Sequence, residues 1–144
     1  VEDRQGLRDA LQQGSLDAIC SDHQPHEPDA KQGPFPSTEP GISGLDTLLP
    51  LGLRLVEESI TDLSGLLRCM TSAPAEILGL PCGTLATGSS ADICIFNPEL
   101  SWLLDAQSVR SNGLNTPFLG WEMKGRVTHT LLGGRMVHEL EGSA

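Results

Sequence analysis

The segment 24–42 restricts the possible folds of this chain more than any other stretch of its sequence. It contains five prolines and two glycines, and each proline removes a backbone donor and fixes φ. Neither a helix nor a strand can run through it, so we expect a long surface loop. Loops of this length in compact domains are usually functional or disordered. The regular structure must therefore lie before and after it.

Apolar periodicity and turn residues predict the elements on either side of the loop. Residues 3–13 are typical of a short helix, and the apolar run 16–21 is typical of a buried strand. After the loop we expect helices over 45–58 and 63–70, and a short one from Ser72 that ends at Gly79. Asp62 or Thr61 should cap the second of these, and Pro50 should kink the first or end its first half.

The start of the first helix and the C-terminal half carry further signals. Ser43-Gly44-Leu45-Asp46 resembles a capping box, with Asp where Glu is usual. Residues 83–97 indicate strand, turn and strand, and 99–104 are a further candidate strand. Two β-rich runs, 126–132 and 135–139, are joined by Gly133-Gly134, which predicts a hairpin with a primed turn. We place a domain boundary near Pro81.

Charge and cysteine usage exclude several classes of partner. The chain has 19 acidic and 9 basic residues, which argues against binding to nucleic acid or to anionic membranes. No apolar run is long enough to span a bilayer. Cysteine spacing matches no zinc module, so we expect four buried thiols in a reducing, cytoplasmic compartment. The abrupt start at Val1, without Met, suggests a piece of a longer protein.

The stretch Ser21-Asp22-His23-Gln24-Pro25-His26 holds the strongest candidates for chemistry. A carboxylate where a strand meets a loop can bind a metal, move a proton or do both. It can also merely cap the loop. Pro25 between the two histidines argues against a shared metal. We expect one histidine to face a pocket and the other to pack outside it.

Other candidate residues carry weaker signals. Thr38-Glu39-Pro40-Gly41 could bring backbone groups close to a polar, planar substrate, although Pro-Gly is also an ordinary turn. His129 and His138 fall on the predicted hairpin and suit surface or cross-strand roles. No Ser-His-Asp triad, phosphate-binding loop or dinucleotide fingerprint is present.

Taken together, these stretches resemble the dihydroorotases of the amidohydrolase superfamily. Ser21 to His26 resembles the segment [ST]DHAPH of that family. Four further stretches match its motifs in order, and they are Lys31 with Pro34-Phe35, Pro40 to Leu51, Ser72 to Leu80 and Gly83 to Pro98. Asn115-Thr116-Pro117-Phe118 and Lys124-Gly125-Arg126-Val127 complete the series. The resemblance covers nearly the whole chain.

The resemblance implies an α/β fold. Dihydroorotases are (β/α)₈ barrels flanked by a small β-sandwich, and a complete barrel needs about 250 residues. This chain has 144, so it resembles only the C-terminal part. Residues 1–81 would be the last strand and helices of the barrel. Residues 82–144 would be the C-terminal part of the sandwich.

The resemblance also implies a mechanism and a set of site residues. The family uses zinc-bound hydroxide to hydrolyse the cyclic amide of dihydroorotate to N-carbamoyl-aspartate, a reversible step of pyrimidine biosynthesis. Asp22 matches the residue that binds the metal and moves the proton. His26 matches the contact to the substrate carboxylate, and Pro40 and Gly41 match the backbone contacts. The other zinc ligands of the family lie upstream of these residues, so this chain alone should be inactive.

Two departures from the family pattern leave alternatives open. Gln24 replaces a small residue, and the context of residues 38–43 also differs. Both resemble non-catalytic dihydroorotase-like chains that support assembly of aspartate carbamoyltransferase, although retention of Asp22 favours activity. A hydantoinase or allantoinase is a third possibility. As a parent enzyme, the protein is expected to be a homo-oligomer.

Overall fold

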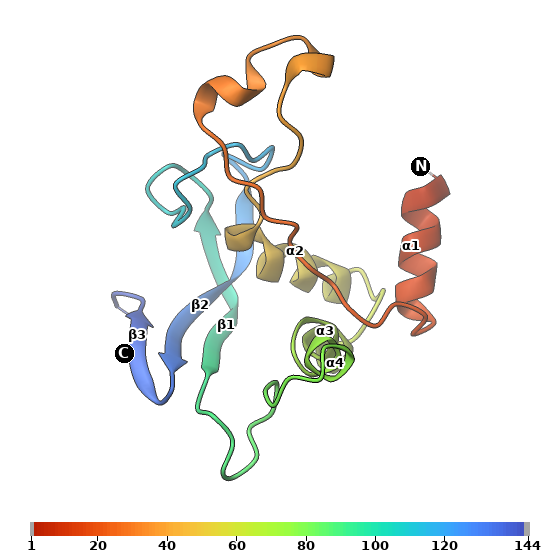
Figure 1. Cartoon of the computed structure of the whole chain (residues 1–144), viewed down its shortest axis with the longest axis vertical. Helices are drawn as coiled ribbons and strands as arrows, with labels where there is room; N and C mark the ends of the chain where they lie inside the picture. The colour runs from red at the N-terminus through yellow and green to blue at the C-terminus, as the bar shows by residue number, and fades with distance from the viewer. Residues whose placement is uncertain (1, 143–144) are drawn as a thin grey trace.

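A helical first half is followed by a three-stranded sheet (Figure 1). The computed structural model describes residues 2–142. The elements are α1 (Glu2–Gln12), the 3₁₀ turns η1 (Pro28–Lys31) and η2 (Phe35–Ser37), α2 (Leu45–Glu57), α3 (Leu63–Met70), α4 (Ser72–Ile77), β1 (Ile93–Leu103), β2 (Glu122–Leu132) and β3 (Arg135–Glu139). Apart from these two short turns, the segment 24–42 is the irregular loop that its prolines predict.

The sheet is antiparallel, with the strand order β1-β2-β3. Gly133 and Gly134, between β2 and β3, have φ values of 56° and 78°. Positive φ at both central residues defines the type I′ turn, whose twist matches that of paired strands. The predicted hairpin and its primed turn are therefore confirmed.

The strand β1 differs from its prediction. Residues 83–92 form turns and no strand, whereas 93–103 form one strand in place of two. The pairing of β1 with β2 is interrupted between Asn97 and Ser101. Pro98 lies in this interruption, and proline cannot donate a hydrogen bond to the ladder. The interruption changes the register without ending the strand.

The predicted helices are confirmed, with small changes at their ends. The Asp62 carboxylate accepts a hydrogen bond from the Gly65 N–H at 2.6 Å, so Asp62 is the cap of α3. Pro50 is buried within α2 and does not end it, because the helix continues to Glu57. This helix packs against β2 (Figure 1). The buried apolar side chains of the chain include Leu53, Leu66, Leu104 and Met123.

Residues 16–21 do not form the predicted buried strand. They run as extended chain between α1 and the loop (Figure 1), and Ile19 N–H donates to the Cys69 carbonyl at 3.0 Å. A parallel strand is held by neighbours on its edges. Within residues 2–142 no strand lies along this segment, so its apolar composition is not sufficient to make it one.

The cysteine prediction is wrong for three of the four thiols. Cys69 is buried, whereas Cys20, Cys82 and Cys94 are exposed. Two of the exposed thiols, Cys20 and Cys82, lie in the extended segment and in the turns before β1, where few elements of the described chain cover them.

Among helices of residues 2–142, none combines the length and apolar character needed to cross a membrane.

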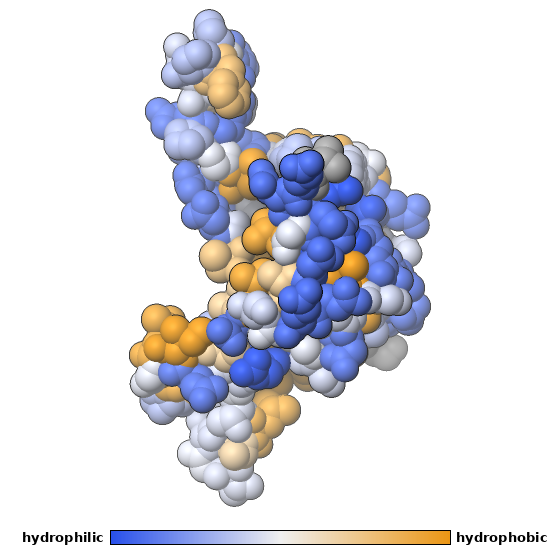
Figure 2. Space-filling view, turned by 90° about the vertical axis from the view of Figure 1, so that its right-hand side faces the viewer, coloured by the Kyte–Doolittle hydropathy of each residue, from blue (hydrophilic) through white to orange (hydrophobic). Residues whose placement is uncertain are grey.

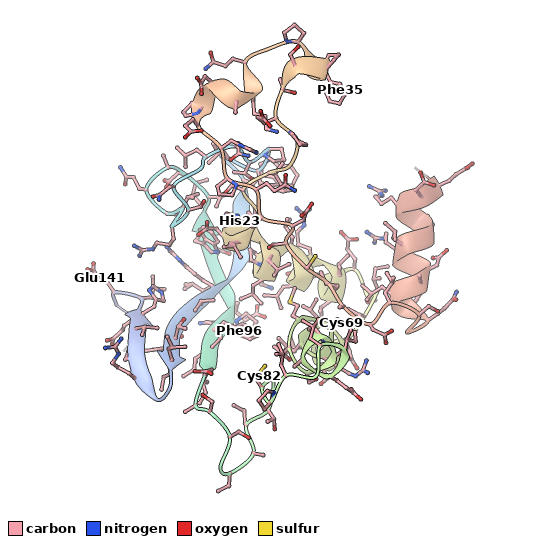
Figure 3. All side chains as sticks on the ribbon, in the orientation of Figure 1. His23, Phe35, Cys69, Cys82, Phe96 and Glu141 are labelled. Carbon is pink, nitrogen blue, oxygen red and sulfur yellow. The ribbon has the colours of Figure 1, made fainter. Side chains whose placement is uncertain are left out.

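Large apolar side chains are exposed over much of the surface, and orange patches mark some of them on the face shown in Figure 2. Phe35 is 92% exposed at the tip of the loop (Figure 3), and Leu85 is 81% exposed. Exposed apolar patches of this kind favour association. We expect the isolated 144-residue chain to self-associate, as measured by size-exclusion chromatography with light scattering. A monomer with a sharp, reversible unfolding transition would contradict this.

Candidate active site

The two ends of the 24–42 loop meet at its base, while its middle projects from the molecule (Figure 1). His23 and Ile42 form a parallel β-bridge. Next to it, Gln24 N–H donates to the Ile42 carbonyl at 2.8 Å. This closure brings the segment 22–26 beside the segment 40–44. All four predicted site residues therefore belong to one region of the structure.

His26 and Pro40 are direct neighbours. The Nε2 atom of His26 lies 3.1 Å from the Pro40 carbonyl oxygen, so in the tautomer with a proton on Nε2 the ring donates to that carbonyl. Lys31 Nζ donates to the Gly41 carbonyl at 2.8 Å and also to the Glu39 carbonyl. These bonds hold the returning arm of the loop against the histidine.

Gly41 is required by its conformation and its surroundings. Its φ is 80°, in the region that only glycine adopts without strain. A Cβ added there would fall 2.5 Å from the side-chain amide carbon of Gln24. Its N–H donates no hydrogen bond within residues 2–142. A free backbone donor is thus placed close to His26.

Asp22 lies at the start of this region in an unusual conformation. Its φ is 43°, which is uncommon for a residue with a side chain, although Asp tolerates it better than most. Asp22 is exposed. Within the described chain its carboxylate makes no hydrogen bond or ion pair, so it remains available to a ligand. Such backbone outliers are concentrated at functional sites.

His23 caps helix α2. Its Nδ1 atom accepts hydrogen bonds from the N–H groups of Gly44 (3.1 Å) and Leu45 (3.3 Å), beside the first turn of the helix (Figure 3). The proton of the neutral ring is therefore on Nε2. The predicted capping box is wrong, because Gly44 is the N-cap and no side chain of the box bonds to the helix start.

The cap predicts a measurable effect on stability. We expect His23→Ala in the full-length protein to lower the free energy of unfolding by about 1 kcal/mol, the usual cost of a lost N-cap acceptor. His23→Asn keeps a short acceptor and should recover part of the loss. Thermal or urea unfolding measures both. Equal stability of the alanine variant and the wild type would show that the cap contributes nothing.

A zinc ion does not fit the described residues alone. No group of three His, Cys, Asp or Glu side chains within residues 2–142 could hold a metal. A catalytic zinc needs three protein ligands, and Asp22 is a single candidate. Any complete zinc centre would need ligands from outside this chain.

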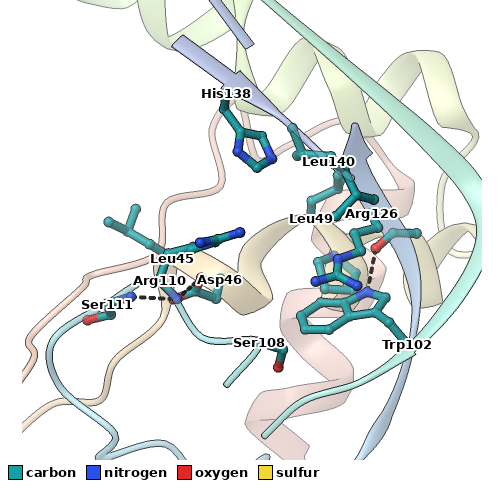
Figure 4. A pocket seen from close by; sticks show the side chains of 13 residues that line it. Leu45, Asp46, Leu49, Trp102, Ser108, Arg110, Ser111, Arg126, His138 and Leu140 are labelled. Atoms are coloured by element: carbon teal, nitrogen blue, oxygen red, sulfur yellow. Dashed lines mark hydrogen bonds between the residues drawn. The ribbon is translucent and has the colours of Figure 1, made fainter. Parts of the chain in front are cut away.

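A second loop, 105–118, packs against the same region, and the sequence patterns did not single out its role. The Asp105 carboxylate accepts from the N–H groups of Ser108 and Gln107, and these bonds hold its pKa below the ordinary value. Asp46 in α2 accepts from Arg110 N–H at 3.0 Å and Ser111 N–H at 3.3 Å (Figure 4). The carboxylate expected in a capping box instead anchors this loop.

One hollow of the described surface is separate from the predicted site residues. It has a volume of about 370 Å³ and lies between the start of α2 and the sheet (Figure 4), lined among others by Trp102, Arg126 and His138. None of the four predicted site residues lines it.

His129 lies opposite Glu139 across β2 and β3, with Nε2 3.9 Å from the carboxylate. The cross-strand role expected for His129 is thus confirmed.

Comparison with known proteins identifies the family. Residues 1–137 match the model of the amidohydrolase family. The chain belongs to this family. A dihydroorotase-like protein of Pseudomonas aeruginosa is 48% identical over 95% of the chain, and a dihydroorotase of Syntrophotalea carbinolica is 46% identical over 96%. The resemblance to dihydroorotases is therefore confirmed.

Solved amidohydrolase structures agree with the fold. An L-hydantoinase (dihydropyrimidinase) from Arthrobacter aurescens superposes on 92% of the chain with a TM-score of 0.84 and 31% identity. A D-hydantoinase superposes with a TM-score of 0.83 at 24% identity, which supports the fold alone. The chain spans about a third of the length of these amidohydrolases. It is a partial amidohydrolase fold, and the boundary near Pro81 stays a prediction.

Proposed function

We propose that this chain is part of a dihydroorotase, which hydrolyses the cyclic amide of dihydroorotate reversibly to N-carbamoyl-aspartate. The observation that carries this proposal is the closed loop base, where Asp22, His26 and Gly41 belong to one region. Relatives named dihydroorotase, such as those of Syntrophotalea carbinolica and Syntrophus aciditrophicus at 46% and 47% identity, support the substrate.

Asp22 is proposed to carry the proton of the reaction. Water adds to the ring amide carbonyl carbon, the C–N bond breaks, and the amide nitrogen gains a proton. An exposed carboxylate without an internal partner can take that proton from the water and deliver it to the nitrogen. Asp22 is also proposed as one zinc ligand, with the remaining ligands supplied from outside this chain.

His26 and Gly41 are proposed to bind the substrate carboxylate. In the tautomer with a proton on Nε2, the His26 ring donates to the Pro40 carbonyl, and a carboxylate is a stronger acceptor than a neutral carbonyl. We therefore expect this N–H to turn to the substrate when it binds. The unpaired Gly41 N–H offers a second donor, and the Pro40 backbone forms the adjoining wall.

Ring closure of N-carbamoyl-aspartate by the full-length protein, with zinc supplied, tests this function. Formation of dihydroorotate is the expected result, and hydantoin and allantoin serve as competing substrates in the same assay. Turnover of hydantoin or allantoin without dihydroorotate would move the assignment to another cyclic amidohydrolase.

A non-catalytic role is the second candidate. Gln24, which packs against Gly41, is a departure from the family pattern, and the Pseudomonas aeruginosa relative is named only dihydroorotase-like. In this case the full-length protein would not turn over dihydroorotate. It would instead form a stable complex with aspartate carbamoyltransferase from the same organism, measured by co-purification and light scattering.

A further inference from the structure

We propose that Asn115 is a positioning residue that sets the backbone of His26 for substrate binding. This inference rests on the proposed function, in which His26 contacts the substrate carboxylate. Asn115 is 89 residues away from His26 along the chain. It lies in the loop 105–118, after the predicted domain boundary.

The Asn115 side chain holds the backbone on both sides of Pro25. The backbone N–H of His26 donates to Asn115 Oδ1 at 2.8 Å, and Asn115 Nδ2 donates to the Gln24 carbonyl at 2.8 Å. A side-chain amide carries a donor and an acceptor in one plane, so the two bonds fix both the position and the orientation of this segment. Proline between them offers no N–H of its own.

Two further contacts join the loop 105–118 to the base of the 24–42 loop. Ser43 N–H donates to the Asn115 carbonyl at 3.2 Å, which ties in the second arm of the loop base. A Cβ added to Gly113 would fall 2.6 Å from Pro25 Cβ and 2.8 Å from His26 N. The Gly113 backbone thus lies directly on the residues that Asn115 holds.

The arrangement predicts an effect on binding rather than on the chemical step. The only hydrogen bond of the His26 ring within the described chain goes to Pro40, so its placement depends on its backbone. Loss of the Asn115 amide frees that backbone, whereas within the described chain Asn115 makes no hydrogen bond to Asp22. A misplaced contact of this kind raises KM, whereas loss of a proton carrier lowers kcat.

Kinetics of the full-length protein with dihydroorotate test the inference. For Asn115→Ala we expect KM to rise about 10-fold or more, with kcat within about 3-fold of the wild type. Asn115→Asp keeps the acceptor for the backbone N–H of His26 but sets a carboxylate oxygen against the Gln24 carbonyl. Because two acceptors repel each other, its KM should rise as well. A wild-type KM in Asn115→Ala, or a loss confined to kcat, would overturn the proposal.

A matched control and a second readout separate this inference from the proposed function. Asn112 is an exposed neighbour whose side chain makes no hydrogen bond within residues 2–142, and Asn112→Ala should leave KM and kcat unchanged. Hydrogen–deuterium exchange of the peptide spanning residues 22–27 should be faster in Asn115→Ala than in the wild type. A wild type that lacks turnover would overturn the substrate assignment and with it the role in binding dihydroorotate. Turnover by the wild type, combined with unchanged hydrogen–deuterium exchange in Asn115→Ala, would overturn only the positioning role of Asn115.

Discussion

Asp22→Asn in the full-length protein is expected to lower kcat for dihydroorotate by about 10²–10⁴-fold, the usual contribution of a positioned acid–base group. Asparagine has the shape of aspartate but cannot carry the proton. It also tolerates the left-handed backbone, where Asp22 has a φ of 43°. The fold should therefore persist, as judged by circular dichroism and the unfolding temperature.

Asp17→Asn provides the matched control for this substitution. Asp17 is an exposed carboxylate in the same extended segment, and its side chain makes no hydrogen bond or ion pair within residues 2–142. Its replacement also removes one negative charge, but it should leave kcat unchanged. A near-normal rate in Asp22→Asn would remove Asp22 from the chemical step. Equal losses in both variants would point to a general effect of charge.

Gly125→Ala is expected to lower the free energy of unfolding more than His23→Ala or Gly88→Ala does. Gly125 has a φ of 92°, and a Cβ there would lie 2.1 Å from Cδ1 of the buried Leu53. The left-handed backbone costs an alanine roughly 1–2 kcal/mol, and overpacking adds about 1–3 kcal/mol. We therefore expect the free energy of unfolding to fall by about 2–5 kcal/mol in urea titrations of the full-length protein.

Gly88→Ala separates these two contributions. Gly88 has the same φ of 92°, but an added Cβ would meet no atom within 4 Å. Its replacement should cost only the backbone strain, roughly 1–2 kcal/mol. The difference between the two variants measures the contact of α2 with β2 at Leu53. Equal losses would mean that Leu53 moves aside without cost.

Local features of the sequence predicted the parts of the fold whose causes are local. The β2–β3 hairpin follows from two glycines in succession, which adopt positive φ without strain. The cap of α3 follows from Asp62, whose acceptor lies three residues from its donor. Elements that need distant partners were predicted less well. Residues 16–21 have the composition of a buried strand, but no neighbouring strand of the described chain pairs with them.

The site shows the same division between local and distant causes. The sequence by itself determined which residue types are available, and the motif from Ser21 to His26 was enough to indicate the family. Only the tertiary structure decided their roles, because each depends on a partner far along the chain. His23 caps a helix that begins 22 residues later, Asp46 holds a loop 64 residues away, and Asn115 holds the backbone of His26 across 89 residues. Side-chain hydrogen bonds to a distant backbone leave no periodic pattern in the sequence, so only the folded chain reveals them.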